Sequence, residues 1–261
     1  MDGELAQIVA LATHGSAWLR LGGPPPELFP THSTFRHVRQ LAFVRPGIAS
    51  ILGRGRHTST ASWYEDLARR RVTALDVAIW LVTRDGLPPH IAVAFRGGGH
   101  WAIAARRGES HELWVPKRSG GGAAVSVEYG SHLVPSPFPR TVPFAEADER
   151  LRMALEAATA FCQAAHLDYW GQWFAEAAVL RHSPEPAIPY HPDLLPAERY
   201  TAEARRLLAC ACKAWVFGGM GTWNDLVFEE ASLEERCDRL TPELFEAVVT
   251  AIASAANEGR A

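Results

Sequence analysis

The stretch HWAIAARRGESHELWVPKRSGGGAAVSVEYG, from His100 to Gly130, contains the clearest β pattern in the chain and decides the fold class. Its segments His100–Arg107, Ser110–Lys117 and Ala123–Gly130 are short and are separated by the turn-forming runs GES and RSGGG. The preceding HIAVAFR, His90–Arg96, is predicted to be a further strand, joined to the next one by a turn of three glycines. Consecutive short strands with tight connections predict an antiparallel meander.

On the C-terminal side of this region, the sequence becomes helical. VPSPFPRTVP, from Val134 to Pro143, is a proline-rich break, and after it apolar residues recur at helical spacing. The predicted helices span Phe144–His166, Tyr169–His182, Pro196–Phe217 and Thr241–Gly259. The last of them is predicted to begin with Thr241 as its cap and Pro242 at its first position.

Strands followed by helices, without strand–helix alternation, predict an α+β fold. We expect an antiparallel meander of about four strands, over residues ~90–130, packed with a mainly helical C-terminal half. At 261 residues the chain is expected to form a single domain over 1–261. Its two subregions would be 1–140, with the antiparallel sheet, and 141–261, which is helical.

The N-terminal part is harder to interpret. The prolines of Gly22–Pro30 require an extended or turned backbone. SWYEDLARRR, Ser62–Arg71, predicts a helix with Ser62 as cap and Glu65 at the capping-box spacing. TALDVAIWLVTRDG, Thr73–Gly86, fits either a buried helix or a core strand, because periodicity does not separate the two in so apolar a run. We favour the helix and keep the strand as the alternative.

Composition points to a globular cytoplasmic protein. The chain is 48% hydrophobic and 21% charged, and it has no apolar run long enough to span a membrane. Its first 15 residues hold two acids and no basic segment, which argues against a cleaved signal peptide. The four cysteines, without a CxxC pair, are expected to be reduced.

Charge is divided unevenly along the chain. Residues 1–110 carry 13 Lys/Arg against 8 Asp/Glu, whereas the remainder carries 13 against 21. From Gly219 to the end the balance is 3 against 9, a net of −6. A basic partner for the C-terminal part is therefore a more natural expectation than a polyanion. We expect no nucleic-acid partner and no membrane partner.

Neither a metal site nor a cofactor site is expected. The 11 histidines do not form a motif with metal-ligand spacing; His32 and His37 lie five apart, and His182 and His191 flank prolines. The glycines of Arg96–His100 lie between two predicted strands, and those of Gly218–Gly221 follow a helix, so neither run has the strand–helix context of a phosphate loop.

His100 offers the one candidate for catalysis, since a histidine that begins a strand and precedes a tryptophan resembles the catalytic histidine of papain-like hydrolases. Such a site needs an activated cysteine, usually at a helix N-terminus. Cys162, Cys210, Cys212 and Cys237 lie instead within or near the ends of predicted helices or among acids. A small cysteine or amide hydrolase is therefore kept only as an alternative, and a structural or regulatory subunit as another.

The C-terminal block has a resemblance of its own. A helix that ends in AWVFGGMGTWNDLVFEE, followed by LTPELFEAVVTAIASAAN, resembles the C-terminal part of an immunity-protein family of bacterial polymorphic toxin systems. The match is the segment GGMGTWND, Gly218–Asp225, together with the closing helix, about the last quarter of the chain. Members are encoded beside restriction-endonuclease-like toxins, including some type VI secretion effectors. The resemblance implies a non-catalytic protein that binds and neutralises a cognate toxin in the cytoplasm of the producing cell.

An acidic surface would attract a nuclease toxin, because nucleases present basic surfaces to their substrate. The expected partner-binding residues are Asn224, Asp225, Glu229, Glu230, Glu234, Glu235 and Asp238. The glycine-rich block also has a structural interpretation that does not depend on a partner. Gly218 or Gly219 is predicted as a left-handed helix C-cap, Gly221 as a second bend and Trp223 as a core anchor, with Asn224 and Asp225 capping the turn.

Overall fold

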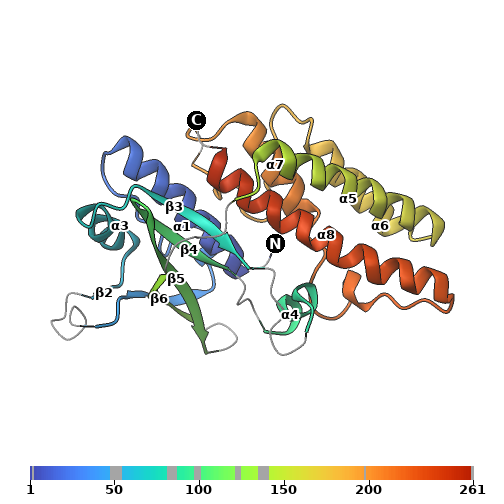
Figure 1. Cartoon of the computed structure of the whole chain (residues 1–261), viewed down its shortest axis with the longest axis horizontal. Coiled ribbons are helices and arrows are strands. Elements are labelled where there is room, and N and C mark those ends of the chain that lie inside the picture. The colour runs from blue at the N-terminus through green and yellow to red at the C-terminus, as the bar shows by residue number, and fades with distance from the viewer. Residues whose placement is uncertain are drawn as a thin grey trace.

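The computed structural model describes residues 1, 3–47, 55–80, 87–96, 101–120, 125–134, 141–196 and 198–259. His100 lies outside these ranges, so the hypothesis of a catalytic histidine there stays untested. The predicted α+β class is confirmed: a sheet lies at one side of the molecule and a group of helices at the other (Figure 1).

Six described strands form one mixed sheet in the order β2-β1-β6-β5-β4-β3. The strands are β1 (Val38–Val44), β2 (Arg56–His57), β3 (Ala74–Ile79), β4 (Trp101–Arg107), β5 (Ser110–Ser119) and β6 (Val125–Val134). Neighbouring strands are antiparallel except β1 and β6, which are parallel. The antiparallel meander is therefore only part of the sheet, which gains β1 and β2 from the N-terminal region.

The first strand of the meander is not the one expected. Residues Ala74–Ile79 form β3, so the favoured helix over Thr73–Gly86 is wrong where the structure describes it, and the strand alternative is right there. Its Leu75 and Val77 alternate with Asp76 and Ala78, so one face joins the main core.

The predicted strand at His90–Arg96 is also wrong, because Pro89–Arg96 is helix α4. Pro89 stands at its first position, where the missing N–H costs nothing. The backbone N–H of Ala92 donates to the Pro88 carbonyl at 2.9 Å and so closes the first turn.

Polar side chains from two helices cover the outer edge of β3. The Ser16 hydroxyl, from α1 (Gly3–Leu21), accepts from the Leu75 N–H and donates to the Leu75 carbonyl, both at 2.7 Å. The Asn257 amide, from α8 (Ala231–Glu258), accepts from the Val77 N–H at 2.7 Å and donates to the Val77 carbonyl at 2.9 Å. These side chains replace the missing neighbouring strand, which satisfies backbone groups that an open edge would leave unpaired.

Helix α1 is buried on nearly all sides, which explains why no amphipathic period revealed it. Its residues from Glu4 to Thr13 are all buried, and it packs against β3, β4 and α8. Gly15 lets α1 approach Tyr64 closely, because a Cβ atom there would lie 2.4 Å from the ring of Tyr64. Tyr64 belongs to α3 (Thr60–Arg69), whose cap is Ser59 rather than the predicted Ser62: the Ser59 hydroxyl accepts from the Ser62 N–H at 3.1 Å.

The C-terminal half contains α5 (Phe144–Ala164), α6 (Asp168–Leu180), α7 (Ala202–Lys213) and α8. Helices α5 and α7 each pack against both α6 and α8, which gives a four-helix arrangement (Figure 1). The predicted helix start at Thr241 is wrong, because α8 runs for 28 residues through Pro242. The part of α8 before Thr241 also contacts α5, where Arg236 lies over the ring of Phe161. The Thr241 hydroxyl donates to the Cys237 carbonyl at 2.8 Å, a bond within the helix.

The predicted glycine C-cap is also wrong. Helix α7 ends at Lys213, with Ala214 as its C-cap, several residues before Gly218 and Gly219. The Lys213 carbonyl accepts instead from the Trp173 indole N–H at 2.6 Å, so a tryptophan satisfies an unpaired carbonyl at the helix end. Among the three glycines of the block only Gly221 has a positive φ, 82°.

Candidate functional site

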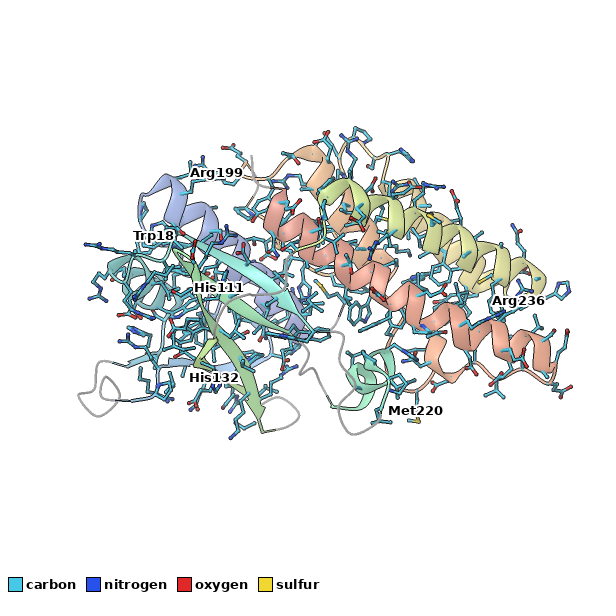
Figure 2. All side chains as sticks on the ribbon, in the orientation of Figure 1. Trp18, His111, His132, Arg199, Met220 and Arg236 are labelled. Carbon is cyan, nitrogen blue, oxygen red and sulfur yellow. The ribbon has the colours of Figure 1, made fainter. Side chains whose placement is uncertain are left out.

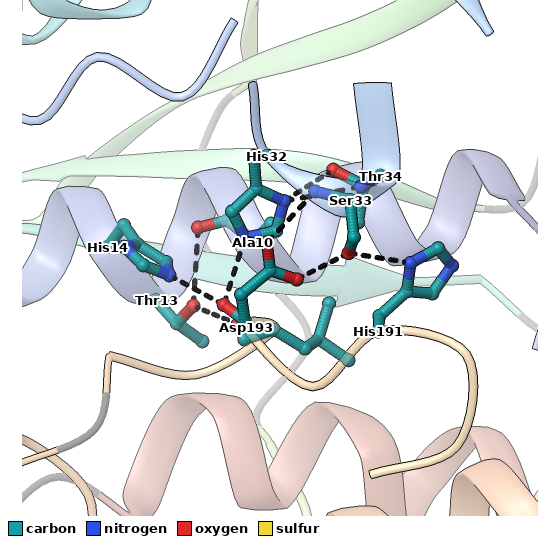
Figure 3. Close-up of polar contacts among 9 residues, drawn as sticks. Ala10, Thr13, His14, His32, Ser33, Thr34, His191 and Asp193 are labelled. Carbon is teal, nitrogen blue, oxygen red and sulfur yellow. Dashed lines mark hydrogen bonds and ion pairs between the residues drawn. The ribbon is translucent and has the colours of Figure 1, made fainter. Parts of the chain in front are cut away.

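Two neighbouring features bring polar and aromatic side chains together. The first is a polar cluster in which the short helix η1 (Ser33–Phe35) meets the proline-rich segment that follows α6 (Figure 3). The Asp193 carboxylate accepts from the Ser33 N–H at 2.9 Å and from the Ser33 hydroxyl. The Asp193 carbonyl accepts from Nε2 of His14 at 3.0 Å and Nε2 of His32 at 2.9 Å. The cluster therefore attaches the proline-rich segment to α1 and η1.

Hydrogen bonding and burial set the protonation of the cluster. Nε2 of His32 must carry a proton to donate to a carbonyl, and its Nδ1 accepts from the Thr34 N–H at 3.3 Å. Burial lowers the pKa of His14 to about 4, so its ring is neutral and donates through Nε2. Burial raises the pKa of Asp193, but hydrogen bonds from the Ser33 hydroxyl and N–H outweigh it, and the net shift is downward.

The Ser33 hydroxyl lies between Asp193 and Nδ1 of His191, the latter at 2.9 Å. In a hydrolase relay the histidine stands between the serine and the acid and takes the serine proton. Here the serine contacts both groups, and it donates to a carboxylate whose lowered pKa makes it a weak base. We interpret the cluster as structural: its hydrogen bonds hold His191 and Asp193 against α1 and η1. We call the cluster of His14, His32, Ser33, His191 and Asp193 the clasp.

The second feature is a pocket of about 470 Å³ that His191 also lines. We call it the aromatic pocket. Its lining residues are Met1, Tyr169, Trp170, Trp173, Tyr190, His191, Trp215, Val216, Phe217, Gly218, Gly221 and Thr222. Tyr169, Trp170 and Trp173 belong to α6, and Tyr190 and His191 belong to the proline-rich segment. The lining residues from Trp215 to Thr222 belong to the chain that follows α7. Lys213 Nζ lies 3.5 Å from the ring centroid of Trp173, on which it forms a cation–π contact.

The Gly218–Asp225 block forms a wall of this pocket and has a well-defined shape. The Thr222 hydroxyl bonds to the carbonyls of Gly218 at 3.1 Å and Gly219 at 2.9 Å. The Asp225 carboxylate accepts from the N–H groups of Gly221 and Thr222, as predicted for a turn cap. Met220, between these anchored residues, is 97% exposed.

Trp223 anchors the block, as predicted, and is 1% exposed. Its ring lies 5.2 Å from Phe174 and 5.7 Å from Trp170, both on α6, and its Nε1 donates to the Thr241 hydroxyl of α8 at 2.9 Å. The beginning of the short helix η2 (Trp223–Asp225) is thus fixed inside the helical half.

The predicted partner-binding residues divide into two groups. Asn224 and Glu234 are half-buried and used internally: the Asn224 amide donates to the His90 carbonyl at 3.0 Å, and the Glu234 carboxylate accepts from the Phe228 N–H at 2.9 Å. The exposed ones are Asp225, whose carboxylate also caps the turn, and Glu229, Glu230, Glu235 and Asp238. Asp225, Glu229 and Glu230 follow Met220 on one connected stretch, whereas Glu235 and Asp238 lie farther along, on α8.

Sequence reasoning missed the exposed aromatic residues beside the block. Tyr190 is 71% exposed and Tyr169 is 65% exposed, and both line the aromatic pocket. The aromatic cluster at the start of α6 was a visible signal. No local pattern marked Tyr190, because it reaches the pocket from the proline-rich segment, which is distant in sequence from the Gly218–Asp225 block.

The four cysteines are all buried, and burial raises the pKa of Cys162, Cys210 and Cys212 to about 12 and that of Cys237 above its usual value. No thiol among them is a ready nucleophile in this conformation. In the part of the chain that the structure describes, no His, Cys, Asp or Glu side chains form a group that could hold a metal ion. Within the same ranges no helix has the length and apolarity to cross a membrane.

Comparisons of the chain with family models, with curated proteins and with solved structures gave no match.

Proposed function

We propose that this protein binds and neutralises a toxic protein with a basic surface, as an immunity protein of the kind that its Gly218–Asp225 block resembles. The observation that supports this proposal is a set of exposed apolar side chains: Tyr169 and Tyr190 line the aromatic pocket, and Met220 stands between the lining residues Gly218 and Gly221. Exposed carboxylates follow Met220 along the chain. Tyr169, Tyr190 and Met220 are 65%, 71% and 97% exposed. Tyrosine and methionine are enriched at protein–protein interfaces, and tyrosine among the residues that dominate binding energy.

Rigidity of the Gly218–Asp225 block favours binding. The Thr222 and Asp225 bonds hold the turn, and Trp223 fixes it to the helical half. A partner that covers Met220 therefore does not have to order a loose loop, and less of the contact energy is lost to conformational entropy. Tyr190 gains the same advantage from the clasp, because the neighbouring His191 is hydrogen-bonded to Ser33.

The charge next to these side chains selects a basic partner. Asp225, Glu229 and Glu230 are exposed, and the chain from Gly219 onward has 9 acids against 3 basic residues. Carboxylates at the edge of an interface attract a basic surface over several ångströms and speed association, an effect that salt weakens. A nuclease toxin, whose substrate is a polyanion, has a surface of this kind. In this proposal the complex forms in the cytoplasm of the producing bacterium.

The decisive experiment is titration calorimetry of the purified protein with the toxin encoded beside its gene. Met220→Ala and Tyr190→Ala are each expected to weaken binding by about 2 kcal/mol, roughly 30-fold. Met153→Ala serves as the matched control, because Met153 is 57% exposed on α5 and belongs neither to the Gly218–Asp225 block nor to the pocket lining. The proposal fails if no complex forms, or if Met220→Ala and Met153→Ala have equal effects.

A charge variant tests the acidic residues separately. Changing Glu229 and Glu230 to lysine is expected to slow association at least about tenfold at low salt and to reduce its salt dependence. Glu109→Lys, an exposed charge change on the β4–β5 turn, is the control. If the Glu229/Glu230 variant and the Glu109→Lys control associate with the toxin at equal rates, the electrostatic part of the proposal is wrong.

A further inference from the structure

A second cavity, of about 550 Å³, lies at the sheet and is separate from the aromatic pocket. Its lining residues are Arg45, Pro46, Arg70, Val72, Ala105, Arg107, Ser110, Glu112, Ser131, His132 and Leu133. They come from the end of β1, the end of α3, the β4–β5 hairpin and the end of β6. Figure 2 labels His132 on the sheet side of the molecule, well away from Met220. We call this cavity the arginine cavity.

Positive charge predominates in the arginine cavity. Among the described residues, three arginines line it against one carboxylate, that of Glu112. Glu112 is 6% exposed and paired with the Arg70 guanidinium, whose other contact is Asp66 at 3.4 Å. Even if Asp66 is counted, the local balance stays positive. Arg70 is therefore occupied, and Arg45 and Arg107 carry the charge that is left.

Arg45 has a buried donor without an acceptor. Its Nε atom is inaccessible to solvent and has no hydrogen-bond partner among the described residues, although the backbone N–H of Arg45 donates to the Gly55 carbonyl at 2.8 Å. An unpaired buried N–H is costly, and a shift of the Arg45 side chain into the cavity would let an oxygen-rich anion satisfy it. Arg107 is exposed and also lines the cavity, and no ion pair joins its guanidinium to a described carboxylate.

The size and walls of the cavity indicate what kind of anion it can hold. Its volume is in the range of small-molecule sites, which is more than a bare phosphate needs. Val72, Ala105 and Leu133 add apolar surface for an organic group. Guanidinium groups match the oxygens of a phosphate with paired hydrogen bonds, and the net positive charge of the cavity favours an anion.

We propose that the arginine cavity is a binding site for a phosphorylated small molecule, with Arg45 and Arg107 holding the phosphate and Val72, Ala105 and Leu133 contacting the organic group. This site is independent of the proposed toxin-binding surface, since none of its residues lines the aromatic pocket.

Titration calorimetry of the full chain with three probes tests this inference. Phenyl phosphate is expected to bind more tightly than inorganic phosphate, which lacks the organic group, and than benzoate, which lacks the second charge. Arg45→Gln and Arg107→Gln should each weaken phenyl phosphate binding at least about tenfold. Arg39→Gln is the matched control, because Arg39 is exposed on β1 and outside the cavity. Thermal unfolding verifies that each variant folds; Arg107 is exposed, so its replacement is the safer of the two.

Three results would overturn the proposal. The first is the absence of saturable binding of phenyl phosphate in the millimolar range. The second is an equal effect of Arg107→Gln and Arg39→Gln, which would indicate unspecific attraction. The third is binding of a single-stranded DNA oligonucleotide while the small phosphates do not bind, since this would make the surface a polyanion site. Toxin binding by Arg107→Gln should be unchanged.

Discussion

Lowering the pH from about 7.5 to about 5 should destabilise the folded protein through His14. In the fold the His14 ring is neutral and donates to the Asp193 carbonyl, and burial lowers its pKa from 6.5 to about 4. The unfolded chain, with a pKa near 6.5, binds a proton that the folded chain excludes between these two values. Stability is therefore complete above about pH 6.5 and declines as the pH falls toward 4. Linkage gives a loss of about 2 kcal/mol at about pH 5 from this one residue.

Urea unfolding at a series of pH values measures this loss. His14→Gln keeps an amide donor for the Asp193 carbonyl but does not titrate, so its stability should fall by about 2 kcal/mol less than that of the wild type over the same interval. The pKa values of His57, His90 and His191 are also lowered, with burial as the largest cause, so some pH dependence should remain. His182→Gln, at an exposed position, is the control and should follow the wild type. Parallel profiles for the wild type and His14→Gln would refute the assignment of His14 as a buried neutral ring.

Three further predictions concern stability and reactivity. Trp223→Ala should cost about 3–5 kcal/mol in urea unfolding because it empties a site between α6 and α8, whereas Trp223→Phe should cost less than half as much; equal costs would contradict the packing described. Asn257→Leu should lower the free energy of unfolding by about 2–3 kcal/mol, because the N–H and carbonyl of Val77 lose their hydrogen-bond partners. An unchanged free energy in urea unfolding would contradict a stabilising role for Asn257 at the β3 edge. The four buried cysteines should react with a thiol reagent only as fast as the protein opens, so rapid labelling of any of them without denaturant would show that its burial is incomplete.

Local sequence was sufficient wherever an element's own residues carry its pattern. Strands β4, β5 and β6 follow from short β-prone runs between glycine-rich turns, and α5 and α6 from an apolar stripe at helical spacing. Trp223 could be predicted as an anchor because a large aromatic residue after a tight turn has the core as its most favourable environment.

The same reasoning failed for the two apolar runs that flank residues 81–86. Leu75 and Val77 are compatible with either a helix or a strand. The strand forms because β4 pairs with one edge of the segment, and Ser16 and Asn257 cover the other edge from helices distant in sequence. The start at Pro89 was a local signal for helix α4, but the β-branched residues that follow favoured a strand.

The candidate site shows the same division. The sequence by itself determined that Gly218–Asp225 is a rigid turn with a buried tryptophan, and that acids follow it. Only the tertiary structure placed Tyr190 and the α6 aromatics beside that turn, and only it used Asn224 and Glu234 for internal bonds. Turn geometry and periodicity depend on neighbours within a few residues, whereas a pocket depends on side chains that meet because helices and strands pack, and that information is distributed over the whole chain.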